Sequence, residues 1–154
     1  MDMDLDALKQ FILDASKATY ASGDKSIKEK QPDGSTTITF EKGVYRYHDN
    51  YFGGEPYGGR EVVFLDNKPA WMMVYYGLVH NSVPAKTIYP FLMESLSQAS
   101  IDSPYRGPAE YRNGSFRYEN KVDGEVDGFS GTEKIFQGDT CVYEASYLGG
   151  LVNQ

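Results

Sequence analysis

The sequence predicts an α+β domain, with a mainly antiparallel sheet of about six strands and two helices packed on it. Three observations support this prediction. Two segments carry apolar residues at helical spacing, most of the remainder alternates in the manner of strands, and the second half of the chain repeats the first. At 154 residues the chain has the usual length of one domain, which we expect to span residues 1–154.

The two helical segments open the two halves of the chain. In DLDALKQFILDASKATY the apolar residues recur every three or four positions, which predicts a helix over about residues 4–20. Its first turn is rich in aspartate, which suits a helix N-terminus. The second segment is TIYPFLMESLSQAS. Because proline is tolerated best in a first turn, Pro90 places the start of this helix near Thr87.

Strand patterns account for most of the remaining chain. After a polar loop at residues 23–35, TTITF predicts a short strand. From Gly43 the apolar residues alternate, and GREVVFLDNKPAWMMVYYG predicts two strands around a turn at residues 66–69. Strands return in GSFRYEN, GTEKIF and TCVYEASY, with turns expected at Asp123–Gly124 and Gly138–Asp139.

The second half of the chain matches the first at a nearly constant offset of 71 and then 72 residues. The matched segments are Gly43–Tyr47 with Gly114–Tyr118, Tyr57–Phe64 with Phe129–Phe136, and Tyr75–Gly77 with Tyr147–Gly149. Chance is the alternative, since Gly, Tyr and Glu are common in this chain. A true repeat predicts two tandem helix-plus-three-strand units, at about residues 4–79 and 85–152, with a cavity between sheet and helices near their twofold axis.

The composition limits the classes of partner. A net charge of −7 and the lack of a basic run argue against direct contact with nucleic acid. The single cysteine, Cys141, rules out an internal disulfide, as is usual in the cytoplasm. The acidic N-terminus does not resemble a signal peptide, and no apolar run is long enough for a membrane span. We therefore expect a cytoplasmic protein without a membrane partner; the sequence predicts no particular oligomeric state.

The repeat singles out two carboxylates, Glu61 and Glu133. Each shares a strand face with an aliphatic residue, so each needs polar partners if it is buried. Tyrosine, with 13 copies, is the abundant source of such partners. One interpretation is structural, with each Glu hydrogen-bonded to Tyr hydroxyls or turn amides. The other is functional: the two carboxylates line one pocket, where they bind a cation or act as a general base.

Other polar residues give weaker signals. His48 and Asp49 form an acid–base dipeptide, but neighbours in a strand face opposite sides, and Asp49-Asn50 is also typical of a turn at a hairpin end. The two histidines lack HxH or HExxH spacing and there is no CxxC, so we predict neither a metal site nor a cofactor. Cys141 is expected to be a structural thiol. Arg106, in SPYRGP, either clamps a carboxylate or phosphate ligand or ties this linker to a buried Glu or to carbonyl groups.

Several stretches resemble a bacterial family known only as a domain of unknown function: YRYHDNYFGGEPYGGREVV, PAWMMVYYG, PYRGPAEYRNGSFRYENKVDGEVDGFSGTEKI and VYEASYLGG. With the leading helix they cover about residues 5–150. In that family the domain also occurs behind a helix-turn-helix DNA-binding module, so the resemblance implies a ligand-sensing role by analogy. The resemblance supplies no catalytic residue. A His often precedes the final Gly pair in that family, where this chain has Leu148.

Together these observations predict a domain that binds a small molecule in a Tyr-lined pocket. The expected ligand-binding residues are Tyr47, His48, Tyr51, Glu61, Trp71, Tyr75, Arg106, Glu133 and Tyr147. Two alternatives stay open. One is a hydrolase or isomerase that uses Glu61 or His48 as its base. The other is a protein-interaction module that uses the aromatic YFGGEPYGG loop as its contact surface.

Overall fold

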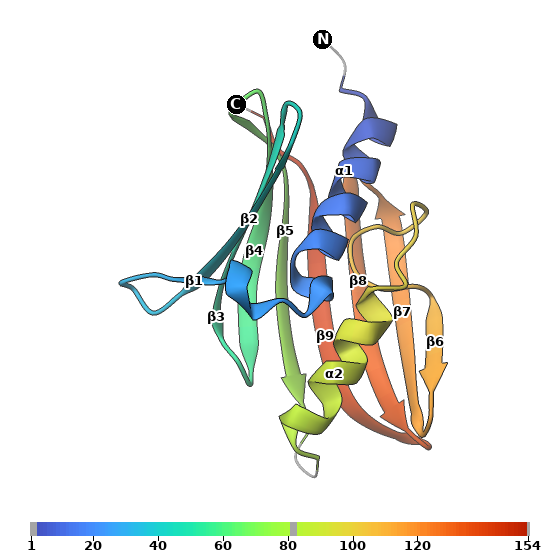
Figure 1. Ribbon diagram of the computed structural model, residues 1–154. Helices are drawn as coiled ribbons and strands as arrows, with labels where there is room; N and C mark the ends of the chain where they lie inside the picture. Colours follow the sequence, from blue (N-terminus) through green and yellow to red (C-terminus); the bar gives the residue numbers. More distant parts are fainter. Residues whose placement is uncertain (1–2, 81–82, 154) are drawn as a thin grey trace.

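One antiparallel sheet, covered on one face by two α-helices, makes up most of the computed structural model, which describes residues 3–80 and 83–153 (Figure 1). The first half contains α1 (Leu5–Ala18), the short 3-10 helices η1 (Tyr20–Ser22) and η2 (Lys25–Ile27), and strands β1 (Glu29–Lys30), β2 (Thr36–Lys42), β3 (Tyr45–Gly53), β4 (Tyr57–Leu65) and β5 (Lys68–Val79). The second half contains α2 (Ala85–Leu96), β6 (Glu110–Asn113), β7 (Phe116–Glu125), β8 (Gly128–Gln137) and β9 (Thr140–Leu151). We call the face that carries the helices the inner face and the opposite one the outer face.

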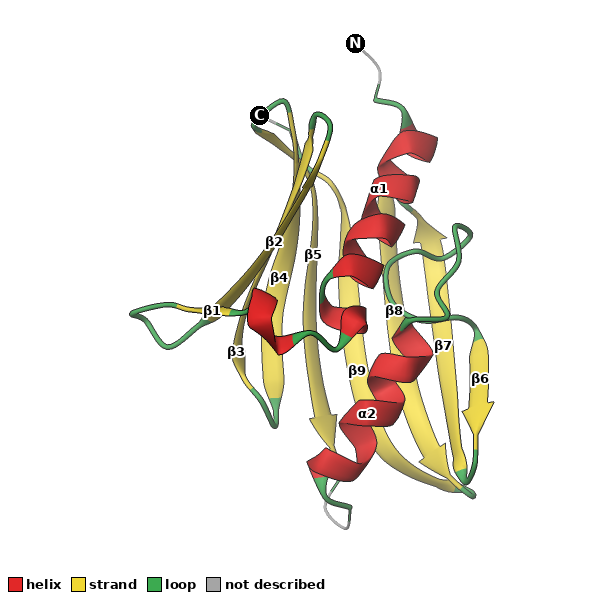
Figure 2. Cartoon of the chain, viewed as in Figure 1, coloured by secondary structure: helices red, strands yellow, loops and turns green. Residues whose placement is uncertain are grey.

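The strand order is β1-β2-β3-β4-β5-β9-β8-β7-β6, so the two halves of the chain meet at the centre of the sheet. At this seam β5 pairs with β9, and Tyr75 lies directly opposite Tyr147. α1 contacts β2 and β3, whereas α2 contacts β6 and β7. Both helices lie on the same face of the sheet, as Figure 2 shows, and the core beneath α1 also takes in Phe129 and Tyr147 of the second half.

The predicted fold class is wrong in its proportions. In the described residues the sheet has nine strands rather than about six, and with two α-helices of 14 and 12 residues the fold is mostly β. The additional strands lie towards the edges: β1, β2 and β6. β2 was expected as a short strand, but not as one of the six strands of the two repeat units. β1 and β6 are short and almost entirely exposed, so they carry no apolar alternation that a sequence pattern could reveal.

The start of the first helix is close to the prediction, but that of the second is not. The Asp4 carboxylate accepts hydrogen bonds from the N–H groups of Asp6 and Ala7, which caps α1. α2 begins at Ala85 after Pro84, and the N–H of Thr87 already donates to the Pro84 carbonyl. Pro90 consequently lies inside the helix rather than in its first turn.

Two predicted turns are also wrong. β3 continues through Asp49-Asn50 to Gly53, because both neighbouring strands pair with it there. The turn expected at Asp123–Gly124 lies at Val126-Asp127; Gly124 adopts a φ of 92° without ending the strand. The turn after β4 is as predicted, and Asp66 and Asn67 both have positive φ there.

Buried side chains fill the space between the helices and the sheet. Beneath α1, Trp71, Tyr105 and Phe129 stack on one another, with the last two ring centroids 4.0 Å apart. Beneath α2, a second cluster surrounds Ile88 and Leu92. The cavity expected between sheet and helices is therefore occupied by the protein's own side chains. None of the helices in the described residues is both long and apolar enough to cross a membrane.

Candidate functional site

Strand alternation places two groups of polar side chains on the inner face, one in each half of the chain. The Glu61 centre consists of Tyr47, Asp49, Glu61 and Tyr75. The Glu133 centre consists of Arg106, Tyr118, Asn120, Glu133, Tyr143 and Tyr147. In the sheet register Asp49 pairs with Glu61 and Asn120 with Glu133, so each centre is built on equivalent neighbours.

Glu133 is fully buried and its carboxylate is fully paired. Nε of Arg106 donates to both carboxylate oxygens at 3.2 Å, and Nη2 donates to Oε1 at 2.5 Å. The Tyr118 hydroxyl donates to Oε2 at 2.6 Å and the Tyr143 hydroxyl to Oε1 at 2.9 Å. This arrangement is the structural interpretation of a buried Glu, and it also shows that Arg106 ties its linker to that Glu.

The linker that carries Arg106 is itself held against the sheet. The Tyr118 hydroxyl accepts a hydrogen bond from the Gly107 N–H, and the Asn120 side-chain amide donates to the Gly107 carbonyl. The Tyr118 ring lies so close to Gly107 that a Cβ there would meet it at 2.6 Å. The position therefore requires glycine, and the guanidinium is fixed in place before any ligand arrives.

Glu61 is equally buried but has far fewer partners. The Tyr47 hydroxyl donates to its Oε1, whereas its Oε2 has no hydrogen-bond partner among the described residues. Asp49, buried beside it, accepts a hydrogen bond from the Tyr75 hydroxyl at 2.5 Å. Neither carboxylate forms an ion pair within the described chain. The Glu61 centre thus holds two adjacent carboxylates without an ion-paired cation; the positive charge of Arg106 acts on both of them only from a distance.

Burial and mutual repulsion shift the titration of this pair. Burial raises the pKa of Glu61 to about 8, and the negative charge of Asp49 adds to the effect. Burial also raises the pKa of Asp49 to about 6, although the hydrogen bond from Tyr75 opposes this. At neutral pH the pair therefore retains a proton. Burial raises the pKa of Tyr47 well above its usual range, so its phenol stays protonated and donates.

A short segment, residues 20–28, covers the Glu61 centre from the helix side and contains η1 and η2. At one end the Tyr20 hydroxyl donates to the Tyr105 carbonyl, and the Tyr20 ring centroid lies 5.4 Å from the Arg106 guanidinium. At the other end the Lys28 ammonium lies 5.8 Å from the centroid of the Tyr51 ring. Neither 3-10 helix contributes a buried residue. We call residues 20–28 the covering segment.

Six of the nine residues predicted for the site fall in the two centres: Tyr47, Glu61 and Tyr75 in one, and Arg106, Glu133 and Tyr147 in the other. Tyr51 lies at the border of the Glu61 centre, half-buried beneath Lys28. Trp71 belongs to the buried stack, and its indole N–H donates to the Val126 carbonyl at 3.0 Å. His48 lies on the outer face, where burial and then Arg60 and Arg46 lower its pKa, so it joins neither centre.

Sequence reasoning missed several members of the two centres: Asp49 as an inner-face carboxylate, Tyr118, Asn120 and Tyr143. The repeat offset contained the signal for some of them. Adding 71 to 47 and to 49 gives Tyr118 and Asn120. Both of these residues occupy, beside Glu133, the places that Tyr47 and Asp49 occupy beside Glu61.

Two hollows lie away from the Glu61 centre. One, of about 390 Å³, is lined by residues of β7, β8 and β9, among them Lys121, Thr132 and Leu148, and Tyr147 reaches its wall. The other, of about 270 Å³, lies between the β2–β3 and β4–β5 turns, with Tyr45 and Asp66 in its lining. Neither of these hollows is lined by Asp49 or Glu61.

Comparison with known proteins places the chain in a family without assigning it an activity. Neither the curated proteins nor the solved structures contain a match to it. The model of a family described as a domain of unknown function, DUF5680, matches residues 49–152. This range includes both carboxylates of the Glu61 centre and the whole Glu133 centre, but not α1 or the covering segment. The chain belongs to the DUF5680 family.

Proposed function

We propose that this domain binds a small organic cation, such as an amine or a guanidinium compound, at the Glu61 centre. One observation carries the proposal: two buried carboxylates lie side by side without an ion-paired cation, and Oε2 of Glu61 has no hydrogen-bond partner in the described chain. When both carboxylates are ionised, like charges on directly opposed strand positions are destabilising, and buried polar groups are normally satisfied. A cationic ligand would supply the missing charge and the missing donor.

The surroundings of the carboxylates suit an organic cation. Three tyrosines, Tyr20, Tyr47 and Tyr75, lie around them and offer both hydroxyls and aromatic faces. The Tyr20 and Tyr75 rings already lie within 5.4 and 5.8 Å of one guanidinium, that of Arg106. A metal ion with a preference for oxygen would require more carboxylate or carbonyl ligands than this centre presents.

The Glu133 centre resembles the proposed cation-bound state of the Glu61 centre, because there the Arg106 guanidinium forms an ion pair with the Glu133 carboxylate. We infer that the two halves arose by duplication. β3–β5 and β7–β9 share the same register and a bulge at the same place, after Val63 and after Ile135. The outer face repeats as well: Arg46 lies over Phe64, and Arg117 over Phe136. On this inference, the Glu61 centre kept the anionic site but takes its cation from outside.

Entry to the centre would involve the covering segment. It contributes no fully buried residue from η1 or η2. Tyr20 and Ala21 pack against the cluster beneath α2 at one end, and Lys28 contacts Tyr51 at the other. Segments with few buried contacts open at low cost in free energy. Its displacement would expose Asp49 and Glu61 while leaving the sheet intact. A ligand-sensing role, which the family resemblance implies, would use the ordering of this segment as its output.

The proposal is tested by a thermal-shift screen of amines, guanidinium compounds and quaternary ammonium compounds at pH 6 and pH 9. A ligand that binds the native state raises the melting temperature in proportion to its concentration and affinity. Because the cation replaces a proton, the shift should be larger at pH 9 than at pH 6. Glu61→Gln should abolish it, whereas Glu41→Gln, an exposed carboxylate on β2, should preserve it. Equal shifts in wild type and Glu61→Gln for every cation that binds would refute the proposal.

General acid–base catalysis by Glu61 is the second candidate function. Its raised pKa, about 8, keeps the group protonated near neutrality and suited to donate a proton. His48 receives no such support, because it lies on the outer face. The two functions differ in outcome: a catalyst would change the identified cation chemically, as followed by mass spectrometry, and Glu61→Gln would stop turnover.

For the interaction-module alternative, the YFGGEPYGG loop offers Phe52, which is 51% exposed, whereas Tyr57 turns inward to Tyr143.

A further inference from the structure

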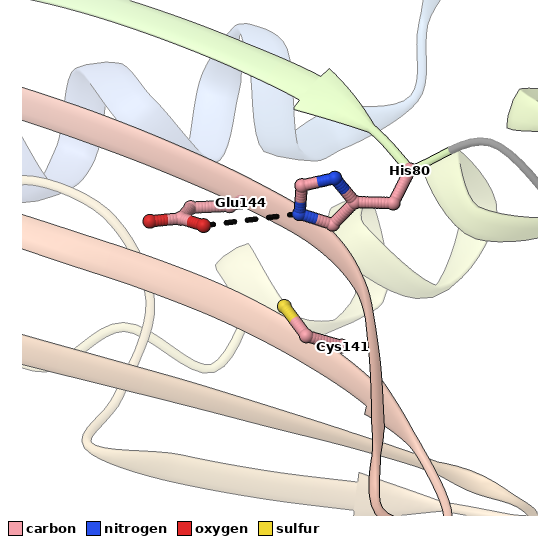
Figure 3. Close-up of side chains that lie close together, drawn as sticks. All are labelled: His80, Cys141 and Glu144. Carbon is pink, nitrogen blue, oxygen red and sulfur yellow. Dashed lines mark ion pairs between the residues drawn. The ribbon is translucent and has the colours of Figure 1, made fainter.

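A second group of chemically active side chains lies at the end of the central seam, where β5 pairs with β9. Its members come from two segments that are far apart in the sequence. His80 directly follows β5, and Cys141 and Glu144 lie on β9. The backbone N–H of His80 donates to the Val142 carbonyl at 2.8 Å, which fixes the end of β5 against β9. One ligand atom from each of His80, Cys141 and Glu144 lies within 4.8 Å of the others. Figure 3 shows these three side chains close together, with the imidazole of His80 facing the carboxylate of Glu144.

We propose that His80, Cys141 and Glu144 bind a zinc ion. Imidazole nitrogen, thiolate sulfur and carboxylate oxygen are the three donor types that Zn²⁺ uses in proteins. The combination excludes Mg²⁺ and Ca²⁺, which select oxygen ligands. Three protein ligands leave a fourth tetrahedral position for water or a substrate atom, as in catalytic rather than structural zinc sites.

The geometry requires only a small adjustment to hold the ion. Metal–ligand bonds of about 2.0–2.3 Å at tetrahedral angles separate the ligand atoms by roughly 3.2–3.6 Å. Nε2 of His80 and Oε2 of Glu144 are already 3.8 Å apart. The Cys141 thiol, which donates to the Tyr143 carbonyl at 3.3 Å, can rotate toward them. Binding breaks the S–H bond, forms a Zn–S bond and releases the thiol proton to solvent.

The environment of the three side chains favours a site that exchanges metal with solvent. The side chains of His80 and Glu144 are 42% and 40% exposed, and Cys141 is half-exposed. Cys141 and Glu144 lie on β9 and His80 directly follows its partner strand β5, so the backbone positions exist without the metal. We therefore expect the fold to persist in the metal-free protein, unlike in a zinc finger. This site is separate from the Glu61 centre and does not depend on the cation proposal.

Cobalt(II) titration of the chelator-treated full chain provides the test. Co²⁺ substitutes for Zn²⁺ and gives a thiolate-to-metal charge-transfer absorption when it binds cysteine. We expect this band at one equivalent of Co²⁺ and its loss on addition of Zn²⁺. Cys141→Ser should abolish the band, and His80→Asn should weaken Zn²⁺ binding by about 100-fold or more. His48→Asn, which changes the other histidine of the chain, is the matched control and should leave both readings unchanged.

Two results would overturn the zinc proposal. One is the absence of the charge-transfer band in wild type. The other is a band of unchanged strength and affinity in His80→Asn, which would mean that the thiol binds Co²⁺ without the imidazole. Circular dichroism of each variant guards against misfolding, and the wild-type titration decides the question even if one variant fails to fold.

Discussion

The Glu61 and Glu133 centres hold their carboxylates in opposite ways at equivalent places on the sheet. Glu133 receives a guanidinium and two phenol hydroxyls, and its strand neighbour is the neutral Asn120. Glu61 receives one phenol hydroxyl, and its neighbour is a second carboxylate, Asp49. The same backbone therefore supports a satisfied and an unsatisfied version of one arrangement, which separates the requirements of the fold from those of a ligand site.

The comparison also shows which residues make the difference. The partner of Glu133 comes from the linker before β6, which carries Arg106. Seventy-one residues earlier the chain has Ser35, so the first half has no arginine at the corresponding position. The exchange of Asn for Asp adds to the contrast, because Asp49 raises the pKa of Glu61 after burial has already done so. Each of these differences can be altered singly.

The largest expected effect on stability is in the Glu133 centre, whose carboxylate is fully paired. Glu133→Gln leaves the Arg106 guanidinium buried without a counter-charge, and we expect it to cost about 3–5 kcal/mol of unfolding free energy. Urea denaturation at pH 7 measures this cost, with Glu41→Gln as an exposed control that changes stability by about 0.5 kcal/mol or less. A loss below about 1 kcal/mol would remove the contrast between the two centres.

The Glu-to-Gln substitution in the Glu61 centre should stabilise the protein at high pH rather than destabilise it. Because the folded state raises the pKa of Glu61 from 4.5 to about 8, it holds that proton more tightly than the unfolded chain does. Stability should therefore fall as the pH rises from about 5 to 8, by at most about 1.4 kcal/mol per pH unit for one proton. The raised pKa of Asp49 adds to this loss of stability between pH 3.8 and about pH 6.

Glu61→Gln should remove most of this slope and make the protein more stable than wild type at pH 9, by roughly 1–3 kcal/mol. Unfolding free energies at several pH values between 5 and 9 provide the measurement. The amide can still accept the hydrogen bond of Tyr47, so the packing should be preserved. A wild-type stability that is flat across this range would show that Glu61 has no raised pKa.

The smallest expected effect comes from making the first centre resemble the second at the neighbouring position. Asp49→Asn keeps an acceptor for the Tyr75 hydroxyl but removes the charge beside Glu61. The pKa of Glu61 should fall below 8, although burial keeps it above its usual value. Carboxyl ¹³C NMR titration of Glu61 reports the change directly. An unchanged titration would mean that burial alone sets the pKa.

The essential features of the two centres could be predicted from the sequence where the pattern was strong. Glu61 and Glu133 stand in matched strands among apolar residues, and both are buried and bonded to tyrosine hydroxyls, as the structural interpretation expected. Arg106 lies between prolines and reaches a buried Glu, as one of its two interpretations required. In these cases local spacing was sufficient, because the cost of an unpaired buried carboxylate restricts the outcomes.

Features that depend on distant parts of the chain could not be predicted in this way. Asp49-Asn50 has the local preference of a turn, yet pairing with strands on both sides keeps it extended. The short edge strands β1 and β6 exist only because a neighbouring strand offers them hydrogen bonds. His80 and Cys141 are 61 residues apart and approach each other only through the pairing of β5 with β9, so a search for metal-binding spacings does not find them.

The position of the seam also has a consequence for the rate of folding. Among the described strands, every pairing except β5·β9 joins strands that are consecutive in the chain, whereas Tyr75 and Tyr147 are 72 residues apart. Closing so long a loop has a high entropic cost before any contact is made, while the hairpins on either side can form locally. Formation of the β5·β9 pair is thus the expected rate-limiting step, and mutations at the seam should slow folding more than those at the outer hairpins.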